Sequence, residues 1–300
     1  MGKPTFRWNR IYISGNDRIF PPQNQHLAWK GRDGVVANDS SHRPDLKKIL
    51  DSTIIDIDKV GERFGRKMDT YDEYATVQRR IARTLASMIR DVSPDRVDSI
   101  LEIGSGTGLL TRMYGPVLKP EKVDFIDLCA VPKYGIASVE RYFRGDAERL
   151  ITDPKLGDYD IITSASAIQW FTNLPLFLKN CCGKLKPNGV FAVSSFLPGN
   201  LCEFDALRPS PLHYLTESEL SRALSSVFES YRVHGEEERV LFKSAADALR
   251  HLSMTGVGAV GRSGIDSIRE LKKYIPRTES GEYYLTYRPV YIVASGPREN

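Results

Sequence analysis

The chain has 300 residues and a mass of 33.8 kDa, enough for one large domain or two of ordinary size. Hydrophobic residues make up 41% and charged residues 27%, as in soluble globular proteins, and no run of about 18 apolar residues could cross a membrane. The net charge of +4 arises at the start, because residues 1–50 contain nine Lys and Arg against four Asp, so the rest is nearly neutral. The composition therefore favours neither nucleic acid nor a membrane as partner.

Residues 1–50 show no sustained hydrophobic periodicity and are interrupted by the turn-forming stretches SGND, PPQNQ, GRDG and NDSSHRP. We therefore expect an irregular or disordered N-terminal extension over 1–50, followed by one domain over 51–300. The first residues lack the apolar core of a signal peptide, and the four Asp argue against a transit peptide. A cytoplasmic protein is expected, with a cleaved targeting segment as the alternative.

Cysteine and histidine give no sign of a metal centre or a disulfide framework. The four cysteines include no C-x-x-C pair, and the five histidines are scattered without metal-ligand spacing. We expect buried thiols in a reducing compartment and no metal site.

The domain is predicted to begin with helix, because apolar residues recur at helical spacing through 54–92, with Ile81, Leu85, Met88 and Ile89 on one face. Short apolar runs and helical stretches then alternate. The predicted strands are 97–104, 122–128, 159–167 and 189–196, and the predicted helices are 108–118, 133–142 and 174–187, the last closed by Pro187. This alternation predicts an α/β fold, with a mostly parallel sheet covered by helices on both faces.

Residues 197–275 break this rhythm and predict a helical cap inserted after the fifth strand of the sheet. Helices are expected at 216–227, where Thr216 and Glu219 form a capping box, and at 244–256, with a hairpin at 230–242 between them. Residues 283–295 are rich in aromatic and β-branched side chains and predict one closing strand. Pro289 within it indicates an edge position or a bulge.

The stretch LEIGSGTG, residues 101–108, places three glycines directly after the first strand of the sheet. In open α/β sheets, ligands bind at the carboxyl ends of the strands. The spacing here is G-x-G-x-G, whereas dinucleotide sites use G-x-G-x-x-G to bind a pyrophosphate. The loop therefore suits a smaller polar ligand, and the helix N-terminus that follows suits a carboxylate.

This loop resembles the first motif of the Rossmann-like class I methyltransferases, which bind S-adenosylmethionine (SAM). The resemblance implies that Asp127 accepts both ribose hydroxyls, that Asp146 and Ala147 of the GDAE segment contact the adenine, and that Ser164 and Ala165 lie beside the transferred methyl. Taken singly, Asp127 could be a turn residue, and GDAE could be a helix N-cap. The implied cofactor-binding residues are Glu102, Gly104, Ser105, Gly106, Gly108, Asp127, Leu128, Asp146, Ala147 and Ser164.

Five further stretches resemble the malonyl-[acyl-carrier-protein] O-methyltransferases of biotin synthesis. They are RFGRKMDTYDEYATVQ, SASAIQWFTNL, LKPNGVFAVSSFLPGNLCEF, LRHLSMTGVGAVGR and YYLTYRPVYIVASG. The resemblance covers about residues 55–297 and leaves residues 1–50 outside. It implies methyl esterification of the free carboxylate of a malonyl thioester on an acyl carrier protein, with SAM as the cofactor. A carboxylate is already ionised at pH 7, so no general base is required.

The resemblance also implies roles for particular side chains. Tyr71 is expected to act as a lid and positioning residue, and Gln169 and Trp170 to shape the acyl pocket; each could instead be an ordinary packing residue. Arg262 is the first candidate to bind the substrate carboxylate and Arg66 the second, because the guanidinium fork matches a carboxylate. Candidates for docking the acidic carrier protein are Arg250, Arg262, Arg269, Lys272 and Lys273.

We expect a monomer, and three other interpretations of the sequence remain open. The chain could methylate a free small carboxylic acid, as trans-aconitate methyltransferases do. It could be a SAM-binding assembly factor or protein-modifying enzyme, whose partner is a protein complex. It could also be a SAM-binding regulator without turnover.

Overall fold

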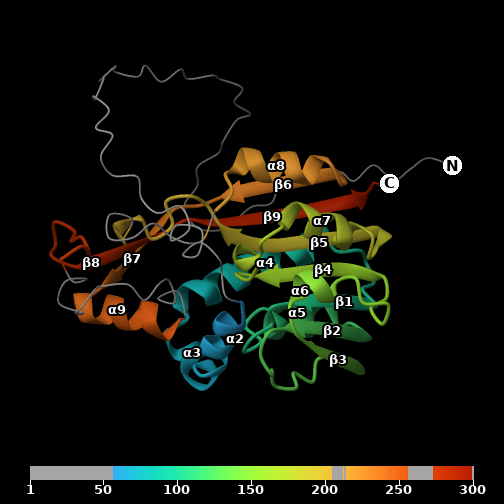
Figure 1. The fold of residues 1–300 in the computed structure, drawn as a ribbon, viewed down its shortest axis with the longest axis horizontal. Helices are drawn as coiled ribbons and strands as arrows, with labels where there is room; N and C mark the ends of the chain where they lie inside the picture. Colours follow the sequence, from blue (N-terminus) through green and yellow to red (C-terminus); the bar gives the residue numbers. More distant parts are fainter. Residues whose placement is uncertain (1–56, 205–211, 213, 256–272, 299–300) are drawn as a thin grey trace, which may run out of the picture. The chain divides into compact units, whose positions relative to one another are not determined.

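The structure, a computed structural model, describes residues 57–204, 212, 214–255 and 273–298, which form a sheet covered by helices (Figure 1). The main sheet has seven strands in the order β3-β2-β1-β4-β5-β9-β6. Their bounds are β1 Ser99–Ile103, β2 Lys122–Asp127, β3 Val139–Arg144, β4 Tyr159–Ala165, β5 Leu185–Phe196, β6 Phe228–Gly235 and β9 Pro289–Pro297. A separate ribbon pairs β7 Glu238–Phe242 with β8 Tyr283–Tyr287.

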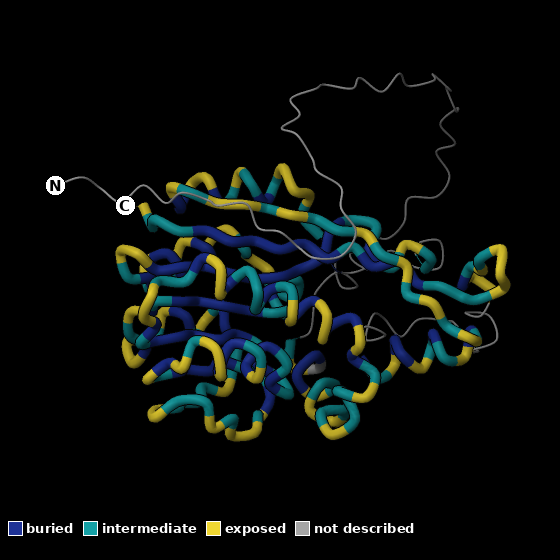
Figure 2. Tube along the Cα trace, turned by 180° about the vertical axis from the view of Figure 1, so that it is seen from behind, coloured by how far each residue is buried: buried dark blue, intermediate teal, exposed yellow. Residues whose placement is uncertain are grey.

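The main sheet is mixed but mostly parallel. Strands β1 to β5 pair in parallel, whereas β9 runs antiparallel to both of its neighbours, β5 and β6. Every residue of β1 is buried, as expected of a central parallel strand with helices on both faces (Figure 2). The predicted α/β class with a mostly parallel sheet is confirmed.

Two hydrophobic cores lie on opposite faces of this sheet. One face is covered by α4 Thr76–Val92 and α5 Thr111–Leu118, whose side chains Leu85 and Tyr114 join the first core. The other face carries α6 Ala147–Leu150, α7 Leu174–Cys182 and α8 Glu217–Ser225, with Phe177 and Leu220 in the second core.

The helical prediction for 54–92 is confirmed over the described part, which contains three helices instead of one. These are α2 Ile57–Gly65, α3 Met68–Tyr74 and α4. Ile81, Leu85 and Ile89 are buried along α4, and Met88 packs against them. The capping box at Thr216 and Glu219 is also confirmed, with both reciprocal hydrogen bonds at the start of α8.

The helix predicted at 133–142 is wrong. Residues 139–144 form β3, which pairs in register with β2 at the edge of the sheet. The Tyr142 ring stacks on Phe125 of β2, with ring centroids 5.1 Å apart. Pairing and packing with a neighbouring strand therefore override the local helical pattern.

The hairpin predicted at 230–242 is also wrong, because β6 pairs with β9 whereas β7 pairs with β8. The single closing strand is in fact two, separated at Arg288. Pro289 lies neither on an edge strand nor at a bulge; it is the first residue of the interior strand β9, where its missing N–H is tolerated. Helix α7 ends at Cys182, so Pro187 does not close it and lies within β5.

The helical cap expected over 197–275 is only partly confirmed, because the described part of this segment contains two strands as well as helices. Strand β6 belongs to the main sheet, and helix α8 packs against it. Outside the main sheet lie α9 Ala245–Met254 and the β7–β8 ribbon, and α9 contacts α3 and both ribbon strands. His251 anchors α9 from within the core, with its Nε2 atom 2.8 Å from the hydroxyl of Tyr287.

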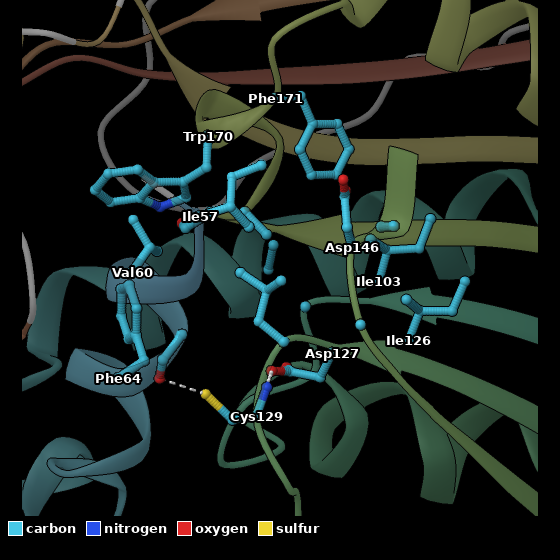
Figure 3. Close-up of a pocket in the computed structure, with 18 of the residues that line it drawn as sticks. Ile57, Val60, Phe64, Ile103, Ile126, Asp127, Cys129, Asp146, Trp170 and Phe171 are labelled. Carbon is cyan, nitrogen blue, oxygen red and sulfur yellow. Dashed lines mark hydrogen bonds between the residues drawn. The ribbon is translucent and has the colours of Figure 1, made fainter. Parts of the chain in front are cut away.

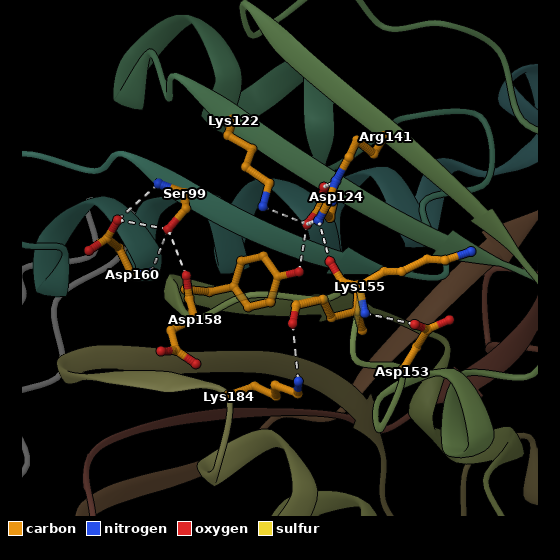
Figure 4. A network of polar contacts seen from close by, with 11 residues as sticks. Ser99, Lys122, Asp124, Arg141, Asp153, Lys155, Asp158, Asp160 and Lys184 are labelled. Carbon is orange, nitrogen blue, oxygen red and sulfur yellow. Dashed lines mark hydrogen bonds and ion pairs between the residues drawn. The ribbon is translucent and has the colours of Figure 1, made fainter.

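A buried polar network joins strands β2, β3 and β4 (Figure 4). Asp124 has no exposed surface and accepts hydrogen bonds from Arg141 at 2.7 and 2.6 Å and from the Tyr159 hydroxyl at 2.6 Å. Burial alone would raise the pKa of Asp124, but the bonds from Arg141, Tyr159 and Lys122 hold it below the ordinary value. The network lies away from the carboxyl ends of the strands, which leaves those ends for a binding site.

Candidate active site

A pocket with an empty volume of about 930 Å³, including its open mouth, lies at the carboxyl ends of β1 to β4 (Figure 3). Its walls come from three places: the strand ends, the η1 turn Ile168–Trp170, and helices α2 and α3. The strand ends supply Ile103, Ile126 and two carboxylates, Asp127 and Asp146. The pocket therefore combines apolar walls with two carboxylates, a lining that suits a ligand with an apolar part and hydrogen-bond donors.

The glycine loop after β1 needs glycine for two reasons. Gly104 and Gly108 have φ angles of +68° and +85°, which side chains disfavour. A Cβ on Gly104 would lie 2.5 Å from the Ala167 side chain, and one on Gly108 would lie 2.5 Å from the Tyr134 ring. The loop can therefore pass close to η1 and remain open to the pocket, which Gly104 lines.

Asp127, at the end of β2, is held in place by the backbone. Its two carboxylate oxygens accept the N–H groups of Gly106 and Cys129, each at 2.8 Å. Burial raises the pKa of Asp127, and these backbone hydrogen bonds oppose the rise. Each oxygen keeps a lone pair for a further donor, so the carboxylate can accept two hydroxyl groups from a ligand.

Asp146 follows β3 and caps α6, because its Oδ1 atom accepts the N–H of Glu148 at 2.9 Å. Asp146 of the GDAE segment is therefore a helix N-cap, which was the alternative interpretation of this segment. The N-cap role does not prevent a ligand contact, because Asp146, Ala147 and Leu128 all line the pocket. Ala147 is the first residue of α6, where backbone N–H groups lack an intrahelical acceptor.

A second, more polar pocket of about 370 Å³ empty volume adjoins the first and shares Tyr71, Gly104, Thr107, Ala165 and Ser166 with it. Two buried atoms at this pocket have no hydrogen-bond partner, the Oε1 of Gln78 and the Oγ of Ser166. Because buried polar atoms are rarely left unpaired, these two favour a polar ligand.

Glu102 lines the same pocket and is 1% exposed. Its Oε2 atom accepts the hydroxyls of Thr111 and Tyr114, both at 2.7 Å. Burial raises the pKa of Glu102 to about 7, although the two hydrogen bonds oppose the rise. Ser105 also lines this pocket, and the hydroxyl of Tyr134 lies 3.0 Å from its Oγ.

Aromatic side chains from α2, α3 and η1 form the wall opposite the sheet. Phe64 packs edge-on against Trp170 and tilted against Tyr71, with ring centroids 6.2 Å apart in both pairs. Tyr71 lines both pockets. Burial, and then the nearby carboxylate of Asp72, raise the pKa of Tyr71 above its ordinary value, so its hydroxyl remains a proton donor at neutral pH.

Two contacts attach these helices to the loops of the sheet. The Asp72 carboxylate accepts the Thr107 hydroxyl at 2.6 Å and pairs with Arg112 at 2.6 Å, which joins α3 to the glycine loop and α5. The Cys129 thiol donates to the Gly61 carbonyl at 2.9 Å, which joins α2 to the loop after β2. We call Asp72, Thr107 and Arg112 the α3 latch.

The other predicted site residues are placed as follows. Trp170 lines the main pocket, whereas Gln169 faces a different cavity on the other side of η1. Ser164 is fully buried and lines neither pocket; its neighbours Ala165 and Ser166 line both. Arg66 is 72% exposed and pairs with Glu62, away from the pocket lining. Arg262 lies outside the described residues, as do Arg269 and Lys272.

Several residues at the site were not predicted. They are Phe64, Asp72, Gln78, Thr107, Cys129 and Phe171. Phe171 follows the predicted Trp170 directly, and Thr107 lies within the glycine loop, so both could have been found by extending those motifs. The side chains on α2, α3 and α4 carried no such signal, because their part in the site depends on how the helices pack.

Two searches of the described residues were negative. No group of three or more His, Cys, Asp or Glu within them could hold a metal ion. None of their helices combines the length and apolar character needed to cross a bilayer.

The chain was compared with known proteins. A family described as "Methyltransferase domain" matches residues 71–232, more than half of the chain. A putative methyltransferase from Bacillus halodurans C-125 aligns with a TM-score of 0.48 at 18% identity, over 71% of this chain and 99% of that chain.

Three similar proteins are named malonyl-[acyl-carrier protein] O-methyltransferase. The Haemophilus influenzae protein is 29% identical over 81% of this chain and 95% of its own length. The Bacteroides fragilis protein is 32% identical over 97% of this chain, so the match includes most of residues 1–50, which the sequence-based resemblance left out. This chain spans 61% of the B. fragilis protein.

The Porphyromonas gingivalis protein is 32% identical over 248 residues, which are 80% of this chain and 96% of that protein. The expected family and the expected cofactor, SAM, are therefore confirmed. The chain is a SAM-dependent methyltransferase and belongs to the malonyl-[acyl-carrier protein] O-methyltransferase family.

Proposed function

We propose that the chain transfers the methyl group of SAM to the free carboxylate of a malonyl thioester carried by an acyl carrier protein. The names of the relatives support this substrate. The observation that carries the reaction type is the wall formed by β4, η1, α2 and α3. Its described lining residues present aromatic and aliphatic side chains and hydroxyls, and include no histidine, lysine or carboxylate that could serve as a general base.

The residues present fit the cofactor. Asp127 can accept two hydroxyls, Asp146 and Ala147 offer an acceptor and a backbone donor, and Ile103 and Ile126 supply apolar walls. The unpaired atoms of Gln78 and Ser166 suit the polar amino-acid end of SAM. When bound, SAM supplies a methyl group activated by its sulfonium.

The chain's contribution is to position the reactants and to exclude water. A carboxyl group with an ordinary pKa near 4 is already ionised and nucleophilic at pH 7. It therefore needs alignment with the methyl group, but no base to deprotonate it. Alignment of this kind contributes roughly 7–11 kcal/mol in favourable systems. Tyr71, Phe64 and Trp170 shield the side of the pocket away from the sheet, which removes water from a bound carboxylate. Tyr71 lines both pockets, which supports a role for its hydroxyl in orienting a reactant.

The malonyl carboxylate needs a cationic or multi-donor partner. No lysine or arginine is among the described residues that line the two pockets, and Arg66 is exposed and paired with Glu62. Arg262 therefore remains the first candidate, and Arg66 is the less favoured one.

The test is a methyl-transfer assay with labelled SAM and three acceptors: malonyl-acyl carrier protein, malonyl-CoA and free trans-aconitate. We expect a base-labile methyl ester on the carrier protein. Acetyl-acyl carrier protein, which has no free carboxylate, is the matched control and should remain unlabelled.

The alternatives give different results in the same assay. Label on trans-aconitate alone would indicate a small-molecule methyltransferase. Measurable SAM binding with no label on any acceptor would overturn the proposal and favour an assembly factor or a regulator.

A further inference from the structure

A cavity of about 590 Å³ empty volume, not used in the proposed reaction so far, lies on the other side of η1 from the main pocket. Gln169 lines this cavity but not the main pocket, Trp170 lines the main pocket only, and Phe171 lines both. The remaining walls come from the start of α7, the end of β5 and the segment before α8, and include Ser195 and Leu215. We call it the η1 cavity. It is separated from the cofactor pocket by one turn of chain.

The lining of the η1 cavity is neutral. Most of its described lining residues are apolar, four carry a neutral polar group (Gln169, Thr172, Ser195 and Tyr214), and none has a charged side chain. A carboxylate or phosphate buried here would meet no cation among the described lining residues, and burying an unpaired charge is costly. The lining suits a neutral ligand.

Gln169, one of the lining residues, carries a polar atom without a hydrogen-bond partner. Gln169 donates from Nε2 to the Ser166 carbonyl at 2.6 Å, which fixes its amide, while its Oε1 is buried without a hydrogen bond. Ser195, on β5, is 8% exposed and lines the same cavity. A cavity lined by an amide with an unpaired acceptor and by a hydroxyl matches a ligand with amide N–H and C=O groups.

We propose that the η1 cavity binds the neutral, amide-bearing arm through which a carrier presents its thioester, with the acyl end passing Phe171 into the cofactor pocket. This inference rests on the proposed function. The Gln169 Oε1 accepts an arm amide N–H, and the apolar walls hold the methylene segments.

The experiment uses the S-methyl thioether of pantetheine, a neutral, unreactive probe that carries two amides. Its binding to the wild-type chain is measured by calorimetry and compared with three variants. Gln169→Leu removes the acceptor, Leu215→Trp fills the cavity, and Leu176→Trp is the control, because Leu176 is 52% exposed on α7 and does not line the cavity. SAM affinity and the melting temperature of each variant verify the fold.

We expect Gln169→Leu to weaken probe binding about tenfold, Leu215→Trp to abolish it, and Leu176→Trp to leave it within twofold. Both cavity variants should raise the KM for malonyl-acyl carrier protein, and SAM affinity should stay within twofold. If Leu215→Trp fails to fold, Gln169→Leu alone decides the question.

The inference and the proposed function can fail separately. Probe binding that is absent in the wild type, or equal in wild type and Gln169→Leu, would overturn the inference even if the carrier protein is methylated. Probe binding that depends on Gln169 with no ester formed on the carrier protein would support the cavity assignment and refute the proposed reaction.

Discussion

Asp127 connects two loops, because one of its oxygens binds the glycine loop and the other binds the backbone after β2. Replacing it therefore affects both the ligand contact and the loops that surround the ligand. A carboxamide of the same shape loses one acceptor and introduces a donor that would face a backbone N–H.

We predict that Asp127→Asn raises the dissociation constant of SAM at least tenfold. The measurement is calorimetric titration, with unfolding followed in parallel. An unchanged dissociation constant in a folded variant would remove Asp127 from the cofactor site.

Glu102 provides a pH-dependent prediction. Its pKa is raised from 4.5 to about 7 in the folded chain, so between these values the folded state holds more protons than the unfolded state. The free energy of unfolding therefore falls as pH rises through this window, by at most about 1.4 kcal/mol per pH unit, and is constant above it.

Glu102→Gln removes this contribution. We predict that the variant gains stability relative to the wild type between pH 5 and pH 7, as measured by urea unfolding without SAM. Taking the difference cancels other titrating groups, such as His251, whose pKa is lowered by burial and which acts with the opposite sign. A difference independent of pH would contradict the raised pKa of Glu102.

The last prediction for a single residue concerns Arg262, the first candidate to bind the substrate carboxylate. Arg262→Ala should raise the KM for the malonyl substrate about tenfold or more, since a buried carboxylate without its cation is costly. SAM affinity should not change. An unaltered KM would transfer the carboxylate-binding role to another cation, with Arg66→Ala as the next variant.

At the scale of elements, helices α2 and α3, which line the main pocket, are attached to the loops at the ends of β1 and β2 by few contacts. The α3 latch is a partly exposed ion pair and hydrogen bond, with side-chain exposures of 38% at Asp72 and 50% at Arg112. Such pairs contribute little to global stability. Their effect should therefore appear in the position of α3, and hence of Tyr71, more than in the melting temperature.

We predict that Asp72→Asn raises the KM for SAM three- to tenfold and shifts the melting temperature by less than about 3 °C. Amide hydrogen exchange in residues 68–74 should become faster. Glu73→Gln, on the exposed side of the same helix, is the matched control. Equal kinetics for the two variants would show that the latch does not position α3.

At the scale of the whole molecule, one end of the sheet supports the fold and the other holds the site. Asp124 joins three strands from a fully buried position. Removing a buried charge partner typically costs about 3–5 kcal/mol. We predict that Asp124→Ala lowers the free energy of unfolding by about 3 kcal/mol, while folded protein keeps its SAM affinity.

The control for this prediction is Asp158→Ala, an exposed aspartate near the same network (Figure 4). Urea unfolding should separate the two variants. Equal stabilities would show that the Asp124 network contributes nothing net to folding.

The sequence predicted the features that depend on local pattern. The glycine loop, the apolar face of α4 and the capping box of α8 are set by residues within one turn or one motif. Prediction from the sequence failed where a segment's structure depends on a partner that is distant in the chain. Residues 139–144 form a strand because β2 lies beside them, and β6 pairs with β9 instead of with β7, which follows it in the sequence. Phe64, Gln78 and Asp72 belong to the site only because helices pack over the sheet, which no local pattern reports.

The place of β9 has a consequence for synthesis of the protein. Translation makes β5 and β6 first, yet β9, residues 289–297, lies between them, and among the described strands β6 pairs with β9 alone. Until these residues leave the ribosome, β5 presents an open edge that invites pairing with other chains. A nonsense mutation just before residue 289 would thus remove an interior strand and leave β6 without a neighbour, although it deletes only the last few residues of the sheet.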